Sequence, residues 1–371
     1  MNIPVLGTHR SGFADDALLH RLNAAGISFT RMVVASGWAV VTPALGAKVI
    51  GAGVDEENAF WTAPAIRPGS WNAGGQRTWI APEMGDHSLY FRGGDWSPPA
   101  TMDPGTYHSP VESSESRTAE AGLRRTVSGE NADTQSYECR ATLSSASGNI
   151  YTVSLGRTIG LRTLPPTGNG AHGVSIRVSQ QIVNRDPVAA ALGLGLWSIV
   201  QVPNRTDAVL IMASHGRYDG LYSHYFGELP SSAVEAVGEN LIVRVEQGRR
   251  FKLGLPAGKS GNYVCSVRRS LTPGMHVVVI KRFQVARGGL YVDKPVSGSR
   301  NANGDAIQVY NGPESGDHGF SEIECHSPST PLPPGGSLSF EVDIAVWKLP
   351  SGDLGAFLEQ ELSADLAKLE V

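Results

Sequence analysis

The sequence has few cysteines and no long apolar run, and each shortage excludes a class of protein. Three cysteines occur in 371 residues, at Cys139, Cys265 and Cys325, and none belongs to a Cys-x-x-Cys pair. A disulfide framework and a thiolate zinc site are therefore not expected. No stretch reaches the ~18 consecutive apolar residues that a membrane helix needs. We predict no metal, no cofactor and no membrane partner.

Charge is sparse and nearly balanced. Lys and Arg number 31 against 35 Asp and Glu, which gives a formal net charge of −4, and charged residues make up 18% of the chain. A phosphate-binding surface needs an excess of Lys and Arg, so nucleic acid is not expected as a partner. Residues 1–13 lack the basic start and apolar core of a secretory signal, and we expect a cytoplasmic protein.

The common signatures of nucleophilic and phosphate chemistry are also missing. The sequence contains no Gly-x-Ser-x-Gly, no P-loop and no His-Glu-x-x-His. Gly-x-Gly spacings such as those at 168–170 and 193–195 are not followed by a βαβ pattern. A dinucleotide-binding site is therefore not predicted.

What the sequence does contain is a series of short strand patterns separated by turn residues. Its 44 Gly and 23 Pro are scattered along the chain. Apolar and β-branched residues recur with a period of two in several segments, namely 38–42, 174–178, 241–245, 277–280 and 337–344. We predict an all-β protein, a large antiparallel β-sandwich that forms a single domain over 1–371.

Short helices are expected only near the two ends. Residues 13–26 place Leu18, Leu19 and Leu22 at helical spacing before a stop at Gly26. Residues 353–369 have apolar side chains at the same spacing. The segment 97–131 is rich in Ser, Pro, Gly, Glu and Thr, which predicts a loop excursion that is either simply exposed or overhangs a binding cleft.

The segment 71–87 carries the residue types of a sugar site. Indole faces stack on the C–H faces of a pyranose, while amides and guanidinium groups bind paired hydroxyls. The candidates in this segment are Trp71, Asn72, Gln76, Arg77, Trp79, Glu83, Asp86 and His87. The alternative is structural, with Trp79 in the core and Arg77 paired with a carboxylate in the sheet.

A second concentration of reactive groups lies at 321–326. Strand alternation places Glu322, Glu324 and His326 on one face, where crowding of the two carboxylates would raise the pKa of one of them and suit acid/base catalysis. The alternative is a solvated sheet face. Two weaker candidates are Trp197, on an apolar strand after the turn at 184–187, and the loop with His215 and Tyr218.

In order along the chain, four segments resemble the galactose mutarotase-like superfamily, which includes the aldose 1-epimerases. They are 40–50 with 58–61, 75–80, 182–187 with its following strand, and 321–347, so the resemblance covers the chain from about Trp38 to Lys348. It implies a β-supersandwich with a sugar bound on a concave sheet face. Arg77 then matches the family's arginine, Gln76 replaces its asparagine, and His87 takes the place of its first histidine.

The resemblance further implies that Glu324, or else Glu322, is the base that takes the anomeric hydroxyl proton. The family's second histidine, which protonates the ring oxygen, is replaced by Trp197 or Ser198, so the acid is absent or comes from His215 or His326. Three functions stay open: an epimerase-like enzyme, a non-catalytic sugar-binding protein, and a lyase that uses Tyr218, Tyr222 or Tyr225. We expect a mono- or oligosaccharide ligand and a monomer or homodimer.

Overall fold

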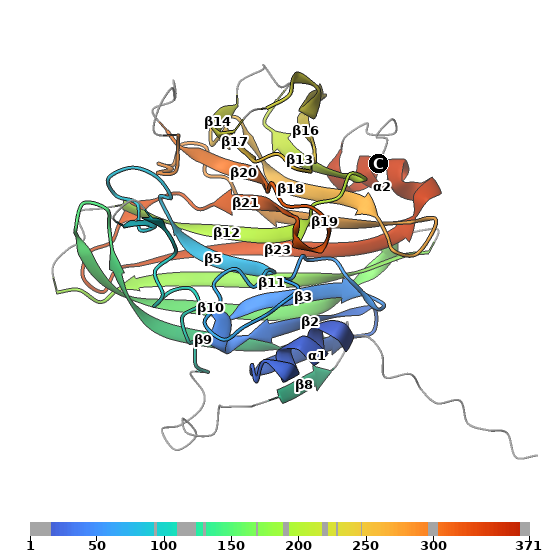
Figure 1. The fold of residues 1–371 in the computed structure, drawn as a ribbon. Helices are drawn as coiled ribbons and strands as arrows, with labels where there is room; N and C mark the ends of the chain where they lie inside the picture. Colours follow the sequence, from blue (N-terminus) through green and yellow to red (C-terminus); the bar gives the residue numbers. More distant parts are fainter. Residues whose placement is uncertain are drawn as a thin grey trace, which may run out of the picture.

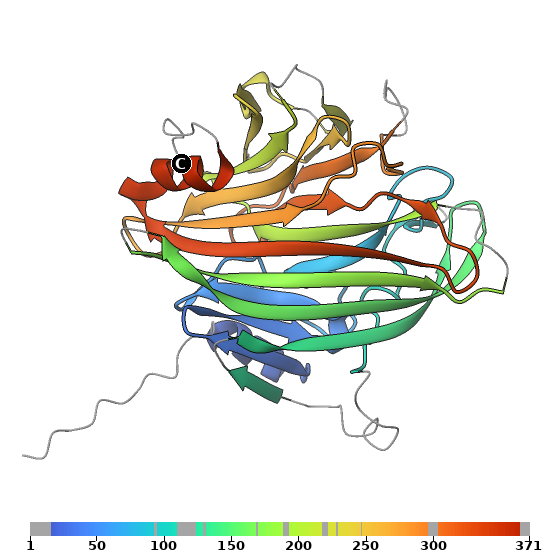
Figure 2. The ribbon, with the colours of Figure 1, turned by 180° about the vertical axis from the view of Figure 1, so that it is seen from behind.

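Two antiparallel β-sheets packed face to face form the body of the protein (Figures 1 and 2). The computed structural model describes residues 16–92, 95–109, 124–128, 131–167, 170–187, 193–216, 222–227, 229–245, 247–295 and 303–363. Within this part of the chain the larger sheet has 12 strands and the smaller has nine, with a separate two-stranded ribbon. The all-β sandwich predicted from the strand patterns is therefore confirmed.

The larger sheet runs in the order β14-β17-β20-β21-β12-β5-β3-β2-β1-β8, with β22 beside β12 and β4 beside β3. All its pairings are antiparallel except that of β1 with β8. Its strands are β1 (Phe29–Val34), β2 (Gly37–Thr42), β3 (Lys48–Val54), β4 (Glu57–Asn58), β5 (Gln76–Ala81), β8 (Arg124–Ser128), β12 (Gly193–Pro203), β14 (Ser223–Phe226), β17 (Phe251–Pro256), β20 (Asp305–Asn311), β21 (Phe320–His326) and β22 (Thr330–Pro331).

The smaller sheet runs in the order β15-β16-β13-β18-β19-β23-β11-β10-β9. Its strands are β9 (Asn131–Ser144), β10 (Ile150–Thr167), β11 (Ala171–Asn184), β13 (Ala208–Ser214), β15 (Val234–Val237), β16 (Asn240–Arg244), β18 (Ser260–Arg269), β19 (Met275–Phe283) and β23 (Ser337–Pro350). The ribbon pairs β6 (Phe91–Arg92) with β7 (Asp95–Trp96), and single 3-10 turns lie at Pro43–Leu45, Ser231–Ala233, Gly316–His318 and Ser351–Asp353.

The main core lies between the sheets and is built by period-two alternation. Strands β12 and β21 contribute Val200, Ile323 and Cys325 to this core, opposite Val279 and Ile344 of the smaller sheet. Ile199 of β12 is also buried but points to the other face of the sheet. Buried polar groups also cross this layer. Lys281 of β19 donates to the carbonyl of Ser198 on β12 at 2.5 Å. We call this side of the larger sheet its inner face.

Two short helices cover parts of the outer faces. Helix α1 (Asp16–Ala24) packs Leu18 and Leu22 against Trp38 and Ile50 on β2 and β3. Helix α2 (Leu354–Leu362) packs on the outer face of the smaller sheet, where Phe357 meets Trp347. Neither helix covers the rest of the larger sheet's outer face, over β5, β12, β21, β20 and β17.

Three predicted boundaries need correction. The C-terminal helix ends at Leu362, because Ser363 takes a left-handed conformation, whereas 353–369 was predicted; residues 364–369 lie outside the described residues. The predicted helix 13–26 is observed as Asp16–Ala24, with 13–15 outside the described residues. The predicted loop 97–131 contains strand β8, and 110–123 and 129–130 lie outside the described residues.

Gly173 on β11 makes room for the ring of Trp347 on the neighbouring strand β23. A Cβ at Gly173 would lie 2.6 Å from Trp347 Cε3 and 2.7 Å from the Val346 carbonyl oxygen. At Gly156 on the neighbouring β10 the nearest atom would be 3.8 Å away. The first position therefore excludes any side chain, while the second does not.

We predict that Gly173→Ala lowers the free energy of unfolding by about 1–3 kcal/mol, because the new methyl group overpacks the sheet against Trp347. Gly156→Ala is the matched control and is expected to change it by less than about 0.5 kcal/mol. Urea unfolding followed by circular dichroism measures both. Equal stability of the two variants would contradict this explanation.

Candidate functional site

The candidate site lies on the outer face of the larger sheet, where five neighbouring strands carry polar and aromatic side chains. Cross-strand pairing puts Ile199 of β12 beside Arg77 of β5 on one side and Glu324 of β21 on the other. Glu322 and Glu324 in turn pair with Tyr310 and Gln308 of β20. Side chains that pair directly in an antiparallel sheet share a face. The strands labelled β5, β12, β21 and β20 in Figure 1 therefore bring distant segments of the chain together.

Alternation along β21 has the phase predicted from the sequence. Ile323 and Cys325 belong to the core between the sheets. Glu322, Glu324 and His326 therefore project from the outer face, and all three are buried. The alternative of a solvated sheet face is not what is observed.

Arg77 and Glu322 form one half of the site. Arg77 Nη2 donates to Glu322 Oε1 at 2.7 Å, and Gln201 Nε2 donates to the same oxygen at 2.9 Å. Gln201 also bonds the side chain of Asn72, which is half-buried. The Arg77 guanidinium carbon lies 4.4 Å from the Trp79 ring centroid, a cation–π contact. The carboxylate pairing that the sequence left as a structural alternative is thus present.

Glu324 and Lys252 form the other half. Lys252 Nζ lies 3.1 Å from Glu324 Oε2 and 2.7 Å from Glu83 Oε2. Trp197 Nε1 donates to Glu324 Oε2 at 2.7 Å, and its ring lies 4.5 Å from the ammonium. Both Lys252 and Glu324 are almost completely buried. The Lys252 ammonium is therefore shared by two carboxylates within the protein.

Burial shifts the titration of these groups. It raises the pKa of Glu324 to about 7, with the carboxylates of Glu322 and Glu83 adding to the effect and Lys252 opposing it. Burial opposes the charge on Lys252, but the nearby carboxylates, Glu324 first, outweigh it and raise the pKa. His326, stacked on Trp197 at 5.4 Å, has a pKa well below its ordinary value because of burial and the nearby lysines. The imidazole is therefore neutral at pH 7.

A second hydrogen-bond network adjoins Lys252. Tyr225 donates to Asp305 Oδ2 at 2.7 Å, and Gln308 Nε2 donates to the Tyr225 hydroxyl at 2.5 Å and to Asp293 Oδ2 at 2.6 Å. Burial raises the pKa of Asp305 to about 7. A Cβ at Gly254 on β17 would lie 2.2 Å from Asp305 Oδ2, so glycine is required there. This network fixes the wall beside Lys252.

Several buried polar atoms of the cluster have no hydrogen-bond partner among the described residues. A buried polar atom without a partner costs about 1–3 kcal/mol and needs a specific explanation. The atoms are Arg77 Nε and Nη1, Gln201 Oε1, Gln308 Oε1, Glu324 Oε1 and both ring nitrogens of His326. Unpartnered donors and acceptors thus occur together on one sheet face, and both kinds are what a ligand with many hydroxyl groups would need.

Indole and phenol rings surround these polar groups. Trp79 lies 5.2 Å from both Tyr90 and Trp197, and 5.6 Å from Trp96. Asp103 holds the Trp79 indole at 2.7 Å and pairs with Lys48 Nζ at 2.6 Å. Burial lowers the pKa of Lys48 to about 8, the nearby Arg77 charge adding to this and Asp103 opposing it. The ion pair of Lys48 with Asp103 therefore fixes the position of the Trp79 ring.

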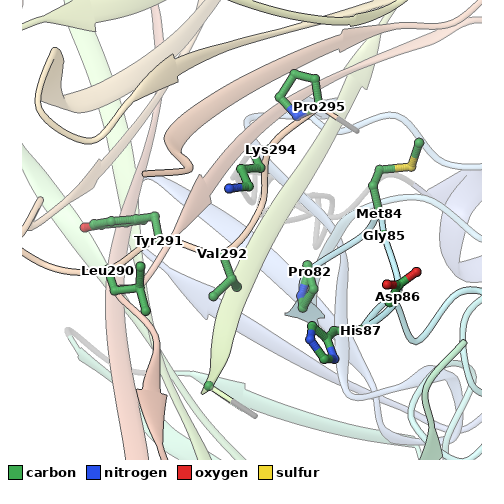
Figure 3. Close-up of a pocket in the computed structure, with 11 residues that line it drawn as sticks. Pro82, Met84, Gly85, Asp86, His87, Leu290, Tyr291, Val292, Lys294 and Pro295 are labelled. Carbon is green, nitrogen blue, oxygen red and sulfur yellow. The ribbon is translucent and has the colours of Figure 1, made fainter. Parts of the chain in front are cut away.

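His87 does not join this cluster. It is exposed and lines a separate cavity of about 420 Å³ with Asp86 and Lys294 (Figure 3). Two segments, 82–87 and 290–295, form a wall between this outer cavity and the cluster. Glu83 turns inward to Lys252 and its backbone N–H donates to Asp293 at 2.7 Å. The sequence neighbours of Glu83 and Asp293, which are Pro82, Met84, Val292 and Lys294, line the outer cavity.

Other predicted residues also lie apart from the cluster. The Gln76 side chain is on the inner face, bonded to Arg157 and Ser198, because it is one residue out of phase with Arg77. His215 is exposed and follows β13 in the smaller sheet. Tyr218 lies outside the described residues. Trp71, in contrast, borders the cluster: it is half-buried, and its ring centroid lies 5.6 Å from the Arg77 guanidinium carbon.

Sequence reasoning missed Lys252, Gln201 and Gln308. A signal for Lys252 was present, because it is the one charged residue in Phe251–Pro256, a strand whose other alternating residues are Phe251, Leu253 and Leu255. A lone lysine between core positions on a strand points to the opposite face. The sequence contains no signal for its partners, which are 72 and 169 residues away.

Within the described residues, no group of three or more His, Cys, Asp or Glu side chains is arranged to hold a metal ion. No helix in this same part of the chain has the length and apolar character to cross a bilayer.

The chain belongs to the DUF6786 family, described as a family of unknown function, whose model matches residues 40–370. No curated protein sequence matches the chain. Solved structures with a similar fold include a galactose mutarotase-like protein from Lactobacillus casei, at 12% identity and a TM-score of 0.48, with 86% of this chain and 99% of that chain covered.

A galactose mutarotase related enzyme from Lactobacillus acidophilus is 10% identical with a TM-score of 0.46, covering 86% of this chain and 97% of that one. A candidate aldose 1-epimerase from Escherichia coli K12 is 10% identical with a TM-score of 0.47, covering 86% and 99%. At these values the similarity carries no conclusion about ligand or activity, and the assignment to the galactose mutarotase-like fold remains a prediction from the sequence.

We predict that the stability difference between the wild-type protein and Glu324→Gln depends on pH. The pKa of Glu324 is raised from 4.5 to about 7 by burial, so its contribution to stability is fully present below pH 4.5 and is lost as the pH rises through 7. The wild-type protein should therefore lose stability relative to the variant across this window, by at most about 3 kcal/mol.

Urea unfolding at pH 4.5, 6 and 7.5 measures this difference. Glu359→Gln, at an exposed position of α2, controls for the loss of one carboxylate. A stability difference for Glu324→Gln that stays constant across the three pH values would contradict the prediction.

Proposed function

We propose that this DUF6786 protein binds a sugar on the outer face of its larger sheet and performs acid/base chemistry at the anomeric centre with Glu324. One observation carries the proposal. Arg77, Glu324 and His326 carry buried polar atoms without a partner among the described residues, and their side chains lie on one sheet face beside indole rings. This combination matches a pyranose, whose hydroxyls take hydrogen bonds while its C–H faces stack on aromatic rings.

The proposed base is one particular oxygen of Glu324. Its Oε2 accepts from Trp197 and contacts Lys252, while Oε1 has no partner among the described residues. A carboxyl group with a pKa near 7 exchanges protons readily at neutral pH. Oε1 therefore takes the proton of the anomeric hydroxyl. Trp197 and Lys252 hold the other oxygen and keep the carboxylate in orientation.

We assign the proton donor to Lys252, in place of the histidine that the family resemblance implies. The ammonium is retained by the charges of Glu324 and Glu83, so its acidity rises when Glu324 becomes neutral. In this step Glu324 gains the anomeric proton, the C1–O bond of the ring breaks, and the ring oxygen takes a proton from Lys252. The aldehyde rotates about its C1–C2 bond, and closure by the reverse transfers restores both groups.

A non-catalytic sugar-binding function is the second candidate. The observation that favours it is the tight ion pair of Lys252 with Glu324, whose side chain is 0% exposed. Such a pair can serve as a fixed part of a binding surface. In that case the cluster binds sugar through Arg77, Gln201 and Asn72 without turnover.

The lyase alternative has less support. Tyr225 donates its hydroxyl hydrogen to Asp305 and accepts from Gln308, so it is not free to act as a base. A uronate carboxylate would also meet an excess of carboxylates, because Arg77 and Lys252 are already paired with Glu322, Glu324 and Glu83. Tyr222 is exposed rather than part of the cluster.

We predict that Glu324→Gln slows anomer interconversion by about 10²–10⁴-fold and retains sugar binding, since it removes a general base while preserving shape. Exchange spectroscopy on glucose, galactose, mannose and xylose measures interconversion, and saturation-transfer NMR measures binding. Glu359→Gln, far from the cluster on α2, is the control and should behave as wild type.

The remaining outcomes separate the alternatives. Binding to the wild-type protein without exchange above the buffer rate would favour the non-catalytic function. Release of an unsaturated product that absorbs in the near ultraviolet from a polyuronate would favour the lyase. Absence of both binding and exchange for every sugar would refute the proposal.

A further inference from the structure

Three half-buried aromatic rings form a row beside the candidate site. They are Phe226 of β14, Tyr310 of β20 and Phe320 of β21, which we call the aromatic row. The Tyr310 ring centroid lies 6.2 Å from that of Phe226 and 5.8 Å from that of Phe320. Trp61, itself buried, packs against Phe320 at 4.7 Å. Packing on Trp61 thus fixes the Phe320 end of the row, while the three rings of the row stay partly exposed to solvent.

The aromatic row is on the same face as the acid/base cluster and is continuous with it. Tyr310 pairs directly with Glu322 on one side and with Lys252 on the other, and Phe226 pairs with Lys252 from the far strand. Two rings of the row therefore flank Lys252 on its neighbouring strands. The Glu322 side chain, 12% exposed, is the charged group of the cluster that lies beside Tyr310.

Polar groups accompany these rings. The exposed Arg250 places its guanidinium carbon 4.6 Å from the centroid of Phe226 and 5.9 Å from that of Tyr310. Burial, with the charge of Glu322, raises the pKa of Tyr310 to about 12, so its hydroxyl keeps its proton at neutral pH. Aromatic rings and hydrogen-bond donors therefore lie together beside the cluster, and a polyhydroxylated ligand can use both.

We propose that the aromatic row is a second binding subsite, which holds the further sugar units of an oligosaccharide whose terminal unit occupies the Arg77–Glu324 cluster. This proposal rests on the proposed function, since it uses the cluster as the first subsite. The three half-buried rings extend over three strands, and Arg250, which lies over Phe226 and Tyr310, supplies a hydroxyl partner beside them together with the Tyr310 hydroxyl. The substrate class is thus a neutral oligosaccharide rather than a free monosaccharide.

Continuity with the cluster is what favours a sugar chain over a protein partner. A neutral chain leaves the pairing of Arg77 with Glu322 and of Lys252 with Glu324 intact, so it needs no new counter-charge. A chain that begins at Glu324 reaches Tyr310 through Glu322, because these residues are neighbours in the sheet.

The test compares chain lengths. Isothermal titration of the wild-type protein with glucose, galactose and N-acetylglucosamine, and with their linear oligomers of two to four units, should show at least one series in which the trimer binds about tenfold more tightly than the monomer. The single variants Phe226→Leu and Tyr310→Leu should lose most of this gain while binding the monomer as wild type does. Tyr310→Phe, which keeps the ring, should retain most of it.

The outcomes distinguish this proposal from the proposed function. Equal affinity for monomer and trimer in every series would overturn the second subsite and leave the first standing. Loss of monomer binding in Arg77→Lys, with monomer binding retained in Phe226→Leu, is expected if both subsites exist. No binding of any sugar to the wild-type protein would overturn both. If the leucine variants convert a dimer to a monomer in sedimentation and leave trimer affinity unchanged, the row is a dimer contact and the proposal is wrong.

Discussion

The buried pairing of Lys252 with Glu324 is the interaction on which the site depends. Two charges without solvent are tolerated only where their partners are close and well aligned. Here Glu83 and Trp197 supply the additional contacts, and each comes from a different part of the chain. The sandwich provides the rigid frame, since its larger sheet fixes Lys252 and Glu324 on strands separated by a single strand. The contact between Lys252 and Glu324 therefore depends on the order of the strands in the larger sheet.

Sheet geometry also explains what could be predicted from the sequence. Alternation on a strand has a fixed period, so one buried apolar residue determines the face of its neighbours. Residues 320–326 contain Ile323, and from it the shared face of Glu322, Glu324 and His326 follows. The sandwich itself follows from the number of such segments and from the scattered glycines.

Strand alternation is enough to correct the assignment of Gln76 to the site, but it says nothing about His87. Gln76 and Arg77 are adjacent on β5, so they cannot share a face, and Gln76 serves the contact with Arg157 between the sheets. His87 lies beyond the strand, in a segment where no period applies, and its exposure depends on how 82–87 meets 290–295. The partners of Lys252 depend on strand order, which a single sequence does not encode in any local pattern.

The wall between the outer cavity and the cluster has two sides made by the same few residues. Glu83 and Asp293 bind Lys252 and Gln308 on one side, while their neighbours line the His87 cavity on the other. The wall that bounds the outer cavity therefore also sets the proton affinity of Lys252, because Glu83 is one of the two carboxylates that keep the ammonium charged.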